Sequence, residues 1–163
     1  MRLEQRLKEQ ALAQGFELAG IAPAGPADGF ERLKEWLARG FAGTMDYMGR
    51  HERARRHPAG VLPTVRTVLM VAMNYAPVRE PSISEREEPD APRNVTGKIA
   101  RYARGDDYHD VLRAKLKQLL AWIQREVPGA QGRAVVDTAP LLERDFARRA
   151  GLGWFGKNTM LIH

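Results

Sequence analysis

AVVDTAPLLERDFARRAGLGWFGKNT, residues 134–159, is the most informative stretch of the sequence. It begins with an apolar run that predicts a short strand over residues 134–136, which ends at the carboxylate Asp137. Pro140 suits the first turn of a helix, because its φ is already helical, and Gly151 suits the end, because it takes the left-handed conformation freely. The buried stripe of this helix is predicted to be Leu142, Phe146 and Ala150. An acid between a strand end and a helix start lies where open α/β sheets usually place their chemistry.

The glycine-rich run GLGWFGKN, residues 151–158, follows that helix. Glycines at this density let the backbone approach a ligand closely. A phosphate-binding P-loop is disfavoured, because the spacing differs from Gly-x-x-x-x-Gly-Lys-Ser/Thr and Asn158 replaces the hydroxyl that would hold magnesium. Two simpler alternatives stay open: Asp137 caps the following helix, and the glycine-rich run is only a tight turn.

The rest of the chain alternates between helical and strand patterns. Helices are predicted over residues 3–14, 29–39 and 108–126, and strands over residues 16–22, 67–73 and 98–103. The strand over residues 67–73 is apolar without alternation, which is typical of a central strand buried on both faces. Residues 78–96 are rich in proline and acids and poor in apolar side chains, which predicts an exposed loop.

Several segments resemble, in order, the motifs of the epoxyqueuosine reductase family: residues 55–58 with 61–63, 99–109, 136–144 and 150–159. The resemblance implies a nitroreductase-like, three-layer α/β domain over residues 1–163, with a central mixed sheet flanked by helices, that binds cobalamin. In the family a ferredoxin-like domain with two [4Fe–4S] clusters follows. This sequence has no cysteine, and cluster ligation requires cysteine thiolates. We therefore expect the chain to be the cobalamin-binding catalytic domain of an incomplete enzyme, without the clusters.

The resemblance also implies an oxidoreductase activity: reduction of epoxyqueuosine to queuosine in tRNA, the last step of queuosine biosynthesis. Asp137 is the candidate proton donor. To donate a proton near neutral pH its pKa must be raised by apolar surroundings, which Trp154 and Phe155 are expected to provide. The cofactor-binding residues that the resemblance implies are Arg55, Ala100, Tyr102, Asp137, Arg144, Trp154, Lys157 and Asn158. Cobalt is expected to have no protein ligand, so no metal-ligating residue is predicted. Tyr102, Asp107, Tyr108 and His109 are expected to line the cleft.

The charge balance allows a polyanionic partner. The 26 basic and 20 acidic residues give a net charge of +6, and neutralised phosphates release counterions. With the family resemblance, the expected partner is tRNA with a queuosine-type anticodon loop, whereas the electron donor is not identified. The sequence contains no apolar run of the roughly 20 residues that a membrane span requires. The N-terminus lacks the apolar core of a signal peptide, so a cytoplasmic location is expected. The chain is also expected to be a monomer and to have no membrane partner.

Two other classes of function compete with the enzyme. One is a cobalamin-handling module that binds the cofactor without catalysing a reaction. The other is an RNA-binding domain that uses the basic residues within 50–56 and 144–149.

Overall fold

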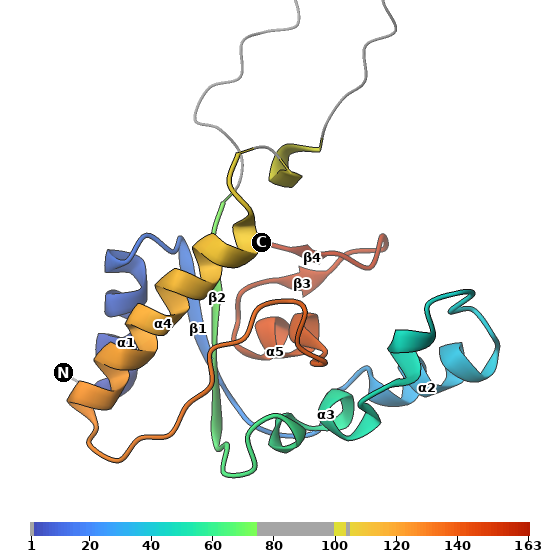
Figure 1. The fold of residues 1–163 in the computed structure, drawn as a ribbon, viewed down its shortest axis with the longest axis horizontal. Coiled ribbons are helices and arrows are strands. Elements are labelled where there is room, and N and C mark those ends of the chain that lie inside the picture. Colours follow the sequence, from blue (N-terminus) through green and yellow to red (C-terminus); the bar gives the residue numbers. More distant parts are fainter. Residues whose placement is uncertain (1, 75–99, 104) are drawn as a thin grey trace, which may run out of the picture.

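The structure is a computed structural model that describes residues 2–74, 100–103 and 105–163. It has the predicted mixed α/β character, and Figure 1 shows the arrangement of its elements. In chain order these are α1 (Leu3–Ala13), β1 (Leu18–Pro23), α2 (Phe30–Ala38), η1 (Asp46–Gly49), α3 (Glu52–Arg56), η2 (Pro58–Gly60), β2 (Thr67–Ala72), η4 (Arg101–Ala103), α4 (Tyr108–Glu126), α5 (Glu143–Arg149), β3 (Trp154–Phe155) and β4 (Leu161–Ile162).

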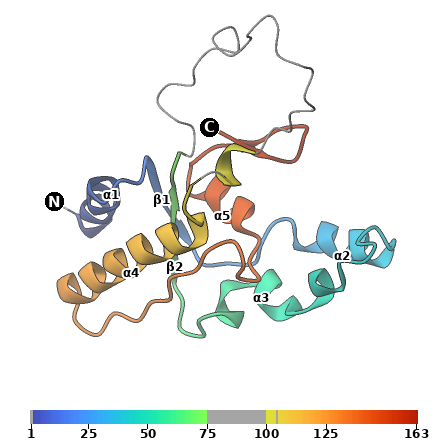
Figure 2. The same cartoon turned by 45° about the horizontal axis from the view of Figure 1, so that its top comes forward.

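Helices cover both faces of the antiparallel pair β1–β2. Both ribbon views place α1 and α4 on one side of these strands and α5 on the other (Figures 1 and 2). Alternate side chains of β2 pack on the two sides of the pair, because successive residues of a strand point to opposite faces. One core contains Ala11, Phe16 and Leu119, with Leu69 and Val71 packed against it. The other contains Ala27, Phe30 and Phe146, with Val68 and Met70 packed against it.

The predicted helices are confirmed. The helix over residues 108–126 is α4, and Asp107 caps it by accepting a hydrogen bond from the His109 N–H at 2.9 Å. Gly15 and Gly151, with φ of 83° and 76°, follow the ends of α1 and α5. The predicted strand over residues 16–22 is β1, which begins two residues later than expected.

The predicted central mixed sheet is not confirmed. Among the described residues, the sheet at the core has two strands and is antiparallel, with Leu18 opposite Ala72 and Pro23 opposite Thr67. The side chains of β2 are partly buried or exposed, so the prediction of a strand buried on both faces is wrong. The physical reason is that β2 pairs only with β1 in the described part, and residues 64–71 line a large cavity.

Three further predictions are also wrong. Instead of a strand, Arg101–Ala103 forms the short 3-10 helix η4. Residues 134–136 have no strand partner in the described part of the chain, and a short apolar run becomes a strand only when another strand pairs with it. Pro140 lies before α5, which begins at Glu143, so it does not occupy the first helical turn.

The loop predicted over residues 78–96 lies outside the described residues. Within the described ranges, no helix combines the length and the hydropathy that crossing a membrane requires.

Candidate active site

Asp137 is held at both of its carboxylate oxygens. The Tyr108 hydroxyl donates a hydrogen bond to Oδ2 at 2.5 Å, and His109 Nε2 lies 3.0 Å from Oδ1. Both partners come from the first turn of α4, so the start of this helix positions the acid. The helix-capping alternative is wrong, because the N-cap residue of α5 is Leu142, which makes no side-chain cap.

His109 bridges two acids. Its Nδ1 lies 2.8 Å from Asp107 Oδ1, while its Nε2 faces Asp137. The hydrogen bond to Asp107 raises the pKa of His109, and the negative charge of Asp137 adds to the effect. In its protonated form the ring therefore donates one hydrogen bond to each carboxylate. The hydrogen bond to Asp137 also raises the pKa of Tyr108 to about 12, which keeps its hydroxyl a neutral donor.

A cavity of about 810 Å³ lies beside this cluster, with Tyr108 and Asp137 in its wall. The rest of the wall is largely apolar and comes from β2, α4 and residues 129–136. Glu143, the first residue of α5, also lines it. Burial raises the pKa of Glu143 to about 7 and the charge of Asp137 adds to this, while Arg144 opposes it. The cavity therefore holds a carboxyl group that keeps its proton to a higher pH than an ordinary glutamate.

Sequence reasoning missed two acids of α5. One is Glu143, which is only partly buried, and the other is Asp145, which is 6% exposed and accepts a hydrogen bond from the Gly29 N–H at 2.7 Å. Asp145 thereby anchors the start of α2. The available signal was that Glu143 belongs to the motif over residues 136–144, but burial depends on how α5 packs, which one sequence does not show.

Tyr102 and Ala100 lie beside the Asp137 cluster. The Tyr102 ring meets the Tyr108 ring edge to face, with centroids 6.1 Å apart and an interplanar angle of 87°. Ala100 is exposed and immediately precedes η4, the short helix that carries Tyr102. The structure therefore links the predicted residues Tyr102 and Asp137 through Tyr108, while Ala100 is close to them only through its position two residues before Tyr102 in the chain.

The glycine-rich run forms the β3–β4 hairpin, so the alternative of a tight turn is correct for its backbone. Trp154 lies in β3, and Lys157 and Asn158 form the turn. Arg144 connects α5 to the hairpin, because its Nη1 donates a hydrogen bond to the Thr159 carbonyl at 2.5 Å.

The expected apolar surrounding of Asp137 is not formed. The Asp137 side chain is 47% exposed, and Trp154 and Phe155 are 58% and 42% exposed. The two aromatic residues therefore present their surface to solvent instead of enclosing the acid. Tyr102 and Met160 are similarly exposed, at 56% and 55%.

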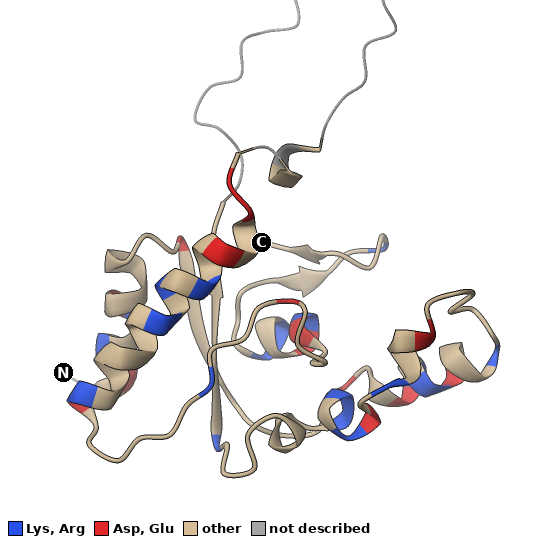
Figure 3. Cartoon of the chain, viewed as in Figure 1, with Lys and Arg blue, Asp and Glu red and all other residues tan. Residues whose placement is uncertain are grey.

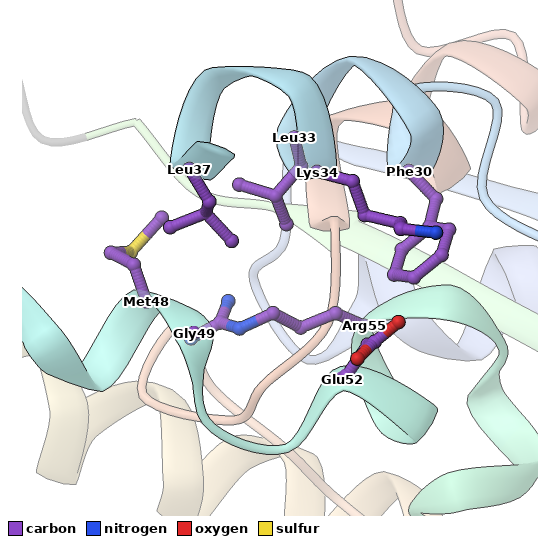
Figure 4. A pocket seen from close by; sticks show the side chains of 8 residues that line it. All are labelled: Phe30, Leu33, Lys34, Leu37, Met48, Gly49, Glu52 and Arg55. Carbon is purple, nitrogen blue, oxygen red and sulfur yellow. The ribbon is translucent and has the colours of Figure 1, made fainter. Parts of the chain in front are cut away.

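Arg55 lies in a different pocket. Figure 4 shows its side chain extending toward Gly49, below α2, in a pocket of about 150 Å³. It donates hydrogen bonds to the carbonyls of Arg50 and Tyr47, at 3.2 and 3.4 Å. The structure thus does not bring Arg55 together with the Asp137 cluster.

The basic residues of α5 are largely paired with acids. Arg148 and Arg149 both form ion pairs with Asp28, and the hydrogen bond from Arg149 is the main cause that lowers the pKa of Asp28. Figure 3 shows acidic and basic residues mixed along α2, α3 and α5. In the described parts of the chain, no group of three or more His, Cys, Asp or Glu is placed to hold a metal ion.

The profile of the family described as "Epoxyqueuosine reductase QueG, DUF1730" matches residues 55–138. The epoxyqueuosine reductase of Gloeobacter violaceus is 45% identical over 159 residues, which are 96% of this chain and 46% of that protein. The chain thus spans less than half the length of this curated relative.

Two solved structures resemble the fold. The epoxyqueuosine reductase of Streptococcus thermophilus superposes with a TM-score of 0.84 at 28% identity, covering 100% of this chain and 42% of that one. An epoxyqueuosine reductase solved with a tRNA-Tyr epoxyqueuosine-modified stem loop superposes with a TM-score of 0.80 at 30% identity. That match covers 98% of this chain and 40% of the other.

Proposed function

The chain belongs to the epoxyqueuosine reductase QueG (DUF1730) family, and from this premise we propose that it takes part in reducing epoxyqueuosine to queuosine in tRNA. The observation that carries the proposal is Asp137, held at both oxygens by Tyr108 and His109 in the wall of the large cavity. This arrangement suits a group that exchanges protons with a bound substrate, because its orientation is fixed and its partners are hydrogen-bond donors.

The role proposed for Asp137 is to deliver a proton to the epoxide oxygen as the carbon–oxygen bond opens. An oxygen that leaves carbon carries developing negative charge, and a positioned acid lowers the barrier by neutralising it. Tyr108 and His109 would hold the carboxyl group in one orientation and keep it facing the cavity.

The residues present fit a large, flat cofactor such as cobalamin, which would supply the electrons for the reduction when bound. Exposed aromatic surface is available on Tyr102 and Trp154, and an ammonium and an amide are available in the hairpin turn at Lys157 and Asn158. We propose that these residues, with Ala100 and Arg144, hold the cofactor through contacts with its ring and its amide side chains. Arg55 is the weakest member of the predicted set, because it lines a separate pocket.

His109 is not suited to ligate cobalt. Both of its ring nitrogens face carboxylates, Asp107 at 2.8 Å and Asp137 at 3.0 Å. A metal ligand needs a free nitrogen lone pair, and both ring nitrogens are already paired with carboxylates. This supports the prediction that cobalt has no protein ligand.

The remaining parts of the enzyme are proposals about the longer protein. We propose that residues 1–163 form its cobalamin-binding domain, of nitroreductase-like three-layer architecture, and that [4Fe–4S] clusters are held outside this cysteine-free chain. A tRNA substrate is supported by the related structure with a modified tRNA stem loop. A cytoplasmic location and a monomeric state stay predictions, and the electron donor is not identified.

The RNA-binding alternative is weakened by the structure. Arg148 and Arg149 are paired with Asp28, and Arg55 donates to backbone carbonyls, so these guanidinium groups are partly neutralised or occupied. The cofactor-handling alternative predicts cobalamin binding without turnover, and the activity measurement separates it from the enzyme.

The test uses a version of the protein extended to the length of its relatives, loaded with cobalamin and supplied with a low-potential reductant. Turnover is measured on a stem loop that carries epoxyqueuosine. We expect Asp137→Asn to slow turnover by about 100-fold or more, because an amide cannot supply the proton. Asp110→Asn on the outer surface of α4, where the side chain is 77% exposed, is the matched control and should leave turnover unchanged.

Cobalamin affinity should change by less than about threefold in Asp137→Asn, because the role proposed for this residue is in proton transfer rather than binding. Unchanged turnover in Asp137→Asn would remove the proton-donor role. Cobalamin binding with no turnover in the extended wild-type protein would favour the handling module.

A further inference from the structure

The proposed reaction consumes two protons. Converting an epoxide to an alkene adds two electrons and two protons and releases one water molecule. The first carbon–oxygen bond opens and the oxygen takes a proton to become a hydroxyl group. The second carbon–oxygen bond then breaks, the two electrons complete the carbon–carbon double bond, and the oxygen leaves with the second proton as water. The electrons come from the reduced cofactor and its low-potential donor, whereas the protons must come through the protein.

The Asp137 cluster alone does not supply both protons. Asp137 accepts from Tyr108 and faces His109, so a proton that it gives away has to be replaced by a neighbour. Tyr108, with a pKa of about 12, is a poor acid at neutral pH. His109 directs both of its nitrogens to carboxylates, so its protons already serve to hold the cluster together.

We propose that Glu143 is the proton reservoir of this site: its carboxyl group reloads Asp137 across the cavity that both residues line. The inference rests on the proposed function. Glu143 is the first residue of α5 and lines the same cavity as Tyr108 and Asp137. Its helix is held in place by Phe146 in the core, 1% exposed, and by the hydrogen bond from Arg144 to the hairpin.

The charges around Glu143 favour a group that holds its proton until it is needed. Burial is the main cause that raises its pKa, and the negative charge of Asp137 raises it further, whereas the adjacent Arg144 lowers it. The hydroxyl of Tyr108 on α4 faces the same cavity. The other charged residues that line this cavity are Arg66 and Arg133.

The first test is the pH profile of turnover in the protein extended to the length of its relatives. The wild type should lose activity as pH rises through about 7, because Glu143 gives up its proton there. Glu143→Gln should lower turnover at pH 6.5 by about tenfold or more and remove this limb of the profile, because an amide carries no exchangeable acid proton. Glu143→Asp should restore part of the activity and of the limb, and Glu31→Gln, 77% exposed on α2, is the matched control.

The second test does not depend on activity. In the 163-residue chain, labelled with ¹³C at glutamate carboxyl groups, the resonance lost in Glu143→Gln should titrate near pH 7. In Asp137→Asn the same resonance should titrate at lower pH, because a negative charge has been removed. The proposal that Glu143 is a proton reservoir would be wrong if its resonance titrated at the usual pH of a glutamate. It would also be wrong if the Glu143→Gln enzyme had the wild-type pH profile. If instead the extended wild type fails to reduce the epoxide while the titration is as expected, the proposed function is wrong, but the electrostatic coupling between Glu143 and Asp137 is confirmed.

Discussion

At the scale of single residues, the site is organised by hydrogen bonds to Asp137 and Asp107. The ring of His109 lies between these acids, and the hydrogen bond to Asp107 is the larger cause of its raised pKa. Both neighbouring carboxylates favour the charged form of the ring.

We therefore predict that Asp107→Asn lowers the pKa of His109 more than Asp137→Asn does. Both variants remove a negative charge, but only Asp107→Asn removes the carboxylate that accepts at Nδ1, 2.8 Å away, and this hydrogen bond is the main cause of the raised pKa. The measurement is an NMR titration of the His109 ring, assigned with His109→Gln. An equal shift in the two variants, or a larger one in Asp137→Asn, would contradict the described pairing.

Glu143 gives a prediction about stability. Its pKa is raised from 4.5 to about 7, so the folded chain holds this proton more tightly than the unfolded chain. Between these two pH values the native state therefore binds more protons, and the free energy of unfolding falls as pH rises. The difference amounts to about 3 kcal/mol at most, at about 1.4 kcal/mol for each pH unit.

Glu143→Gln lacks this titration. The free energy of unfolding of the variant, minus that of the wild type, should therefore increase as pH rises from 4.5 to 8. Urea denaturation at several pH values measures the difference, with Glu31→Gln as the control that should show no such trend. A constant difference between Glu143→Gln and the wild type across this range would show that Glu143 ionises normally.

The residue scale also shows what the sequence could predict. Asp137 was identifiable because it follows an apolar run and lies in a family-like motif, and Tyr108 and His109 because they begin a capped helix. Glu143 was not, because its raised pKa comes from burial in a cavity whose walls are β2, α4 and residues 129–136. Segments so distant in the chain give no local pattern.

At the scale of elements, Gly20 of β1 decides how closely α5 packs on the sheet. A Cβ atom at this position would lie 2.3 Å from the Ala150 carbonyl oxygen and 2.9 Å from the Ala150 Cβ. The close neighbour is backbone, which cannot move without displacing the end of α5. Glycine is therefore required here for close approach rather than for an unusual φ.

We predict that Gly20→Ala destabilises the chain by about 1–3 kcal/mol, as overpacking of a core does. It should also disturb the site, because α5 carries Glu143 and Arg144. Gly49→Ala is the matched control, because a Cβ atom there meets nothing within 4 Å. Thermal or urea unfolding of both variants provides the measurement, and equal stability of Gly20→Ala and the wild type would contradict the packing of α5 on β1.

Elements were predictable where local signals agree. The bounds of α4 follow from the Asp107 cap and from a leucine stripe with helical spacing, and both signals lie within the helix itself. The described part of the strand predicted over residues 98–103, and the strand predicted over residues 134–136, did not form, because strand formation depends on a pairing partner that is distant in sequence. In the described part of the chain, those residues have none.

At the scale of the whole molecule, the chain spans less than half the length of the Gloeobacter violaceus relative, and the cavity of about 810 Å³ lies along β2. The family resemblance was readable from motifs spread over most of the sequence. The layered sheet that it implies was not confirmed, because β1 and β2 form only an antiparallel pair among the described strands. The residues of the site therefore come from α4, from α5 and from the segment between these two helices, which carries Asp137, rather than from the edge of a sheet.

The central claim is that the surface around Asp137 binds cobalamin, with no nitrogen of the protein on cobalt. Titration of the extended protein with cob(II)alamin, followed by visible and electron paramagnetic resonance spectra, tests it most directly. We predict saturable binding and a spectrum without nitrogen coupling from an axial base, unchanged in His109→Gln. Failure to bind, or a nitrogen coupling that disappears in His109→Gln, would contradict the account.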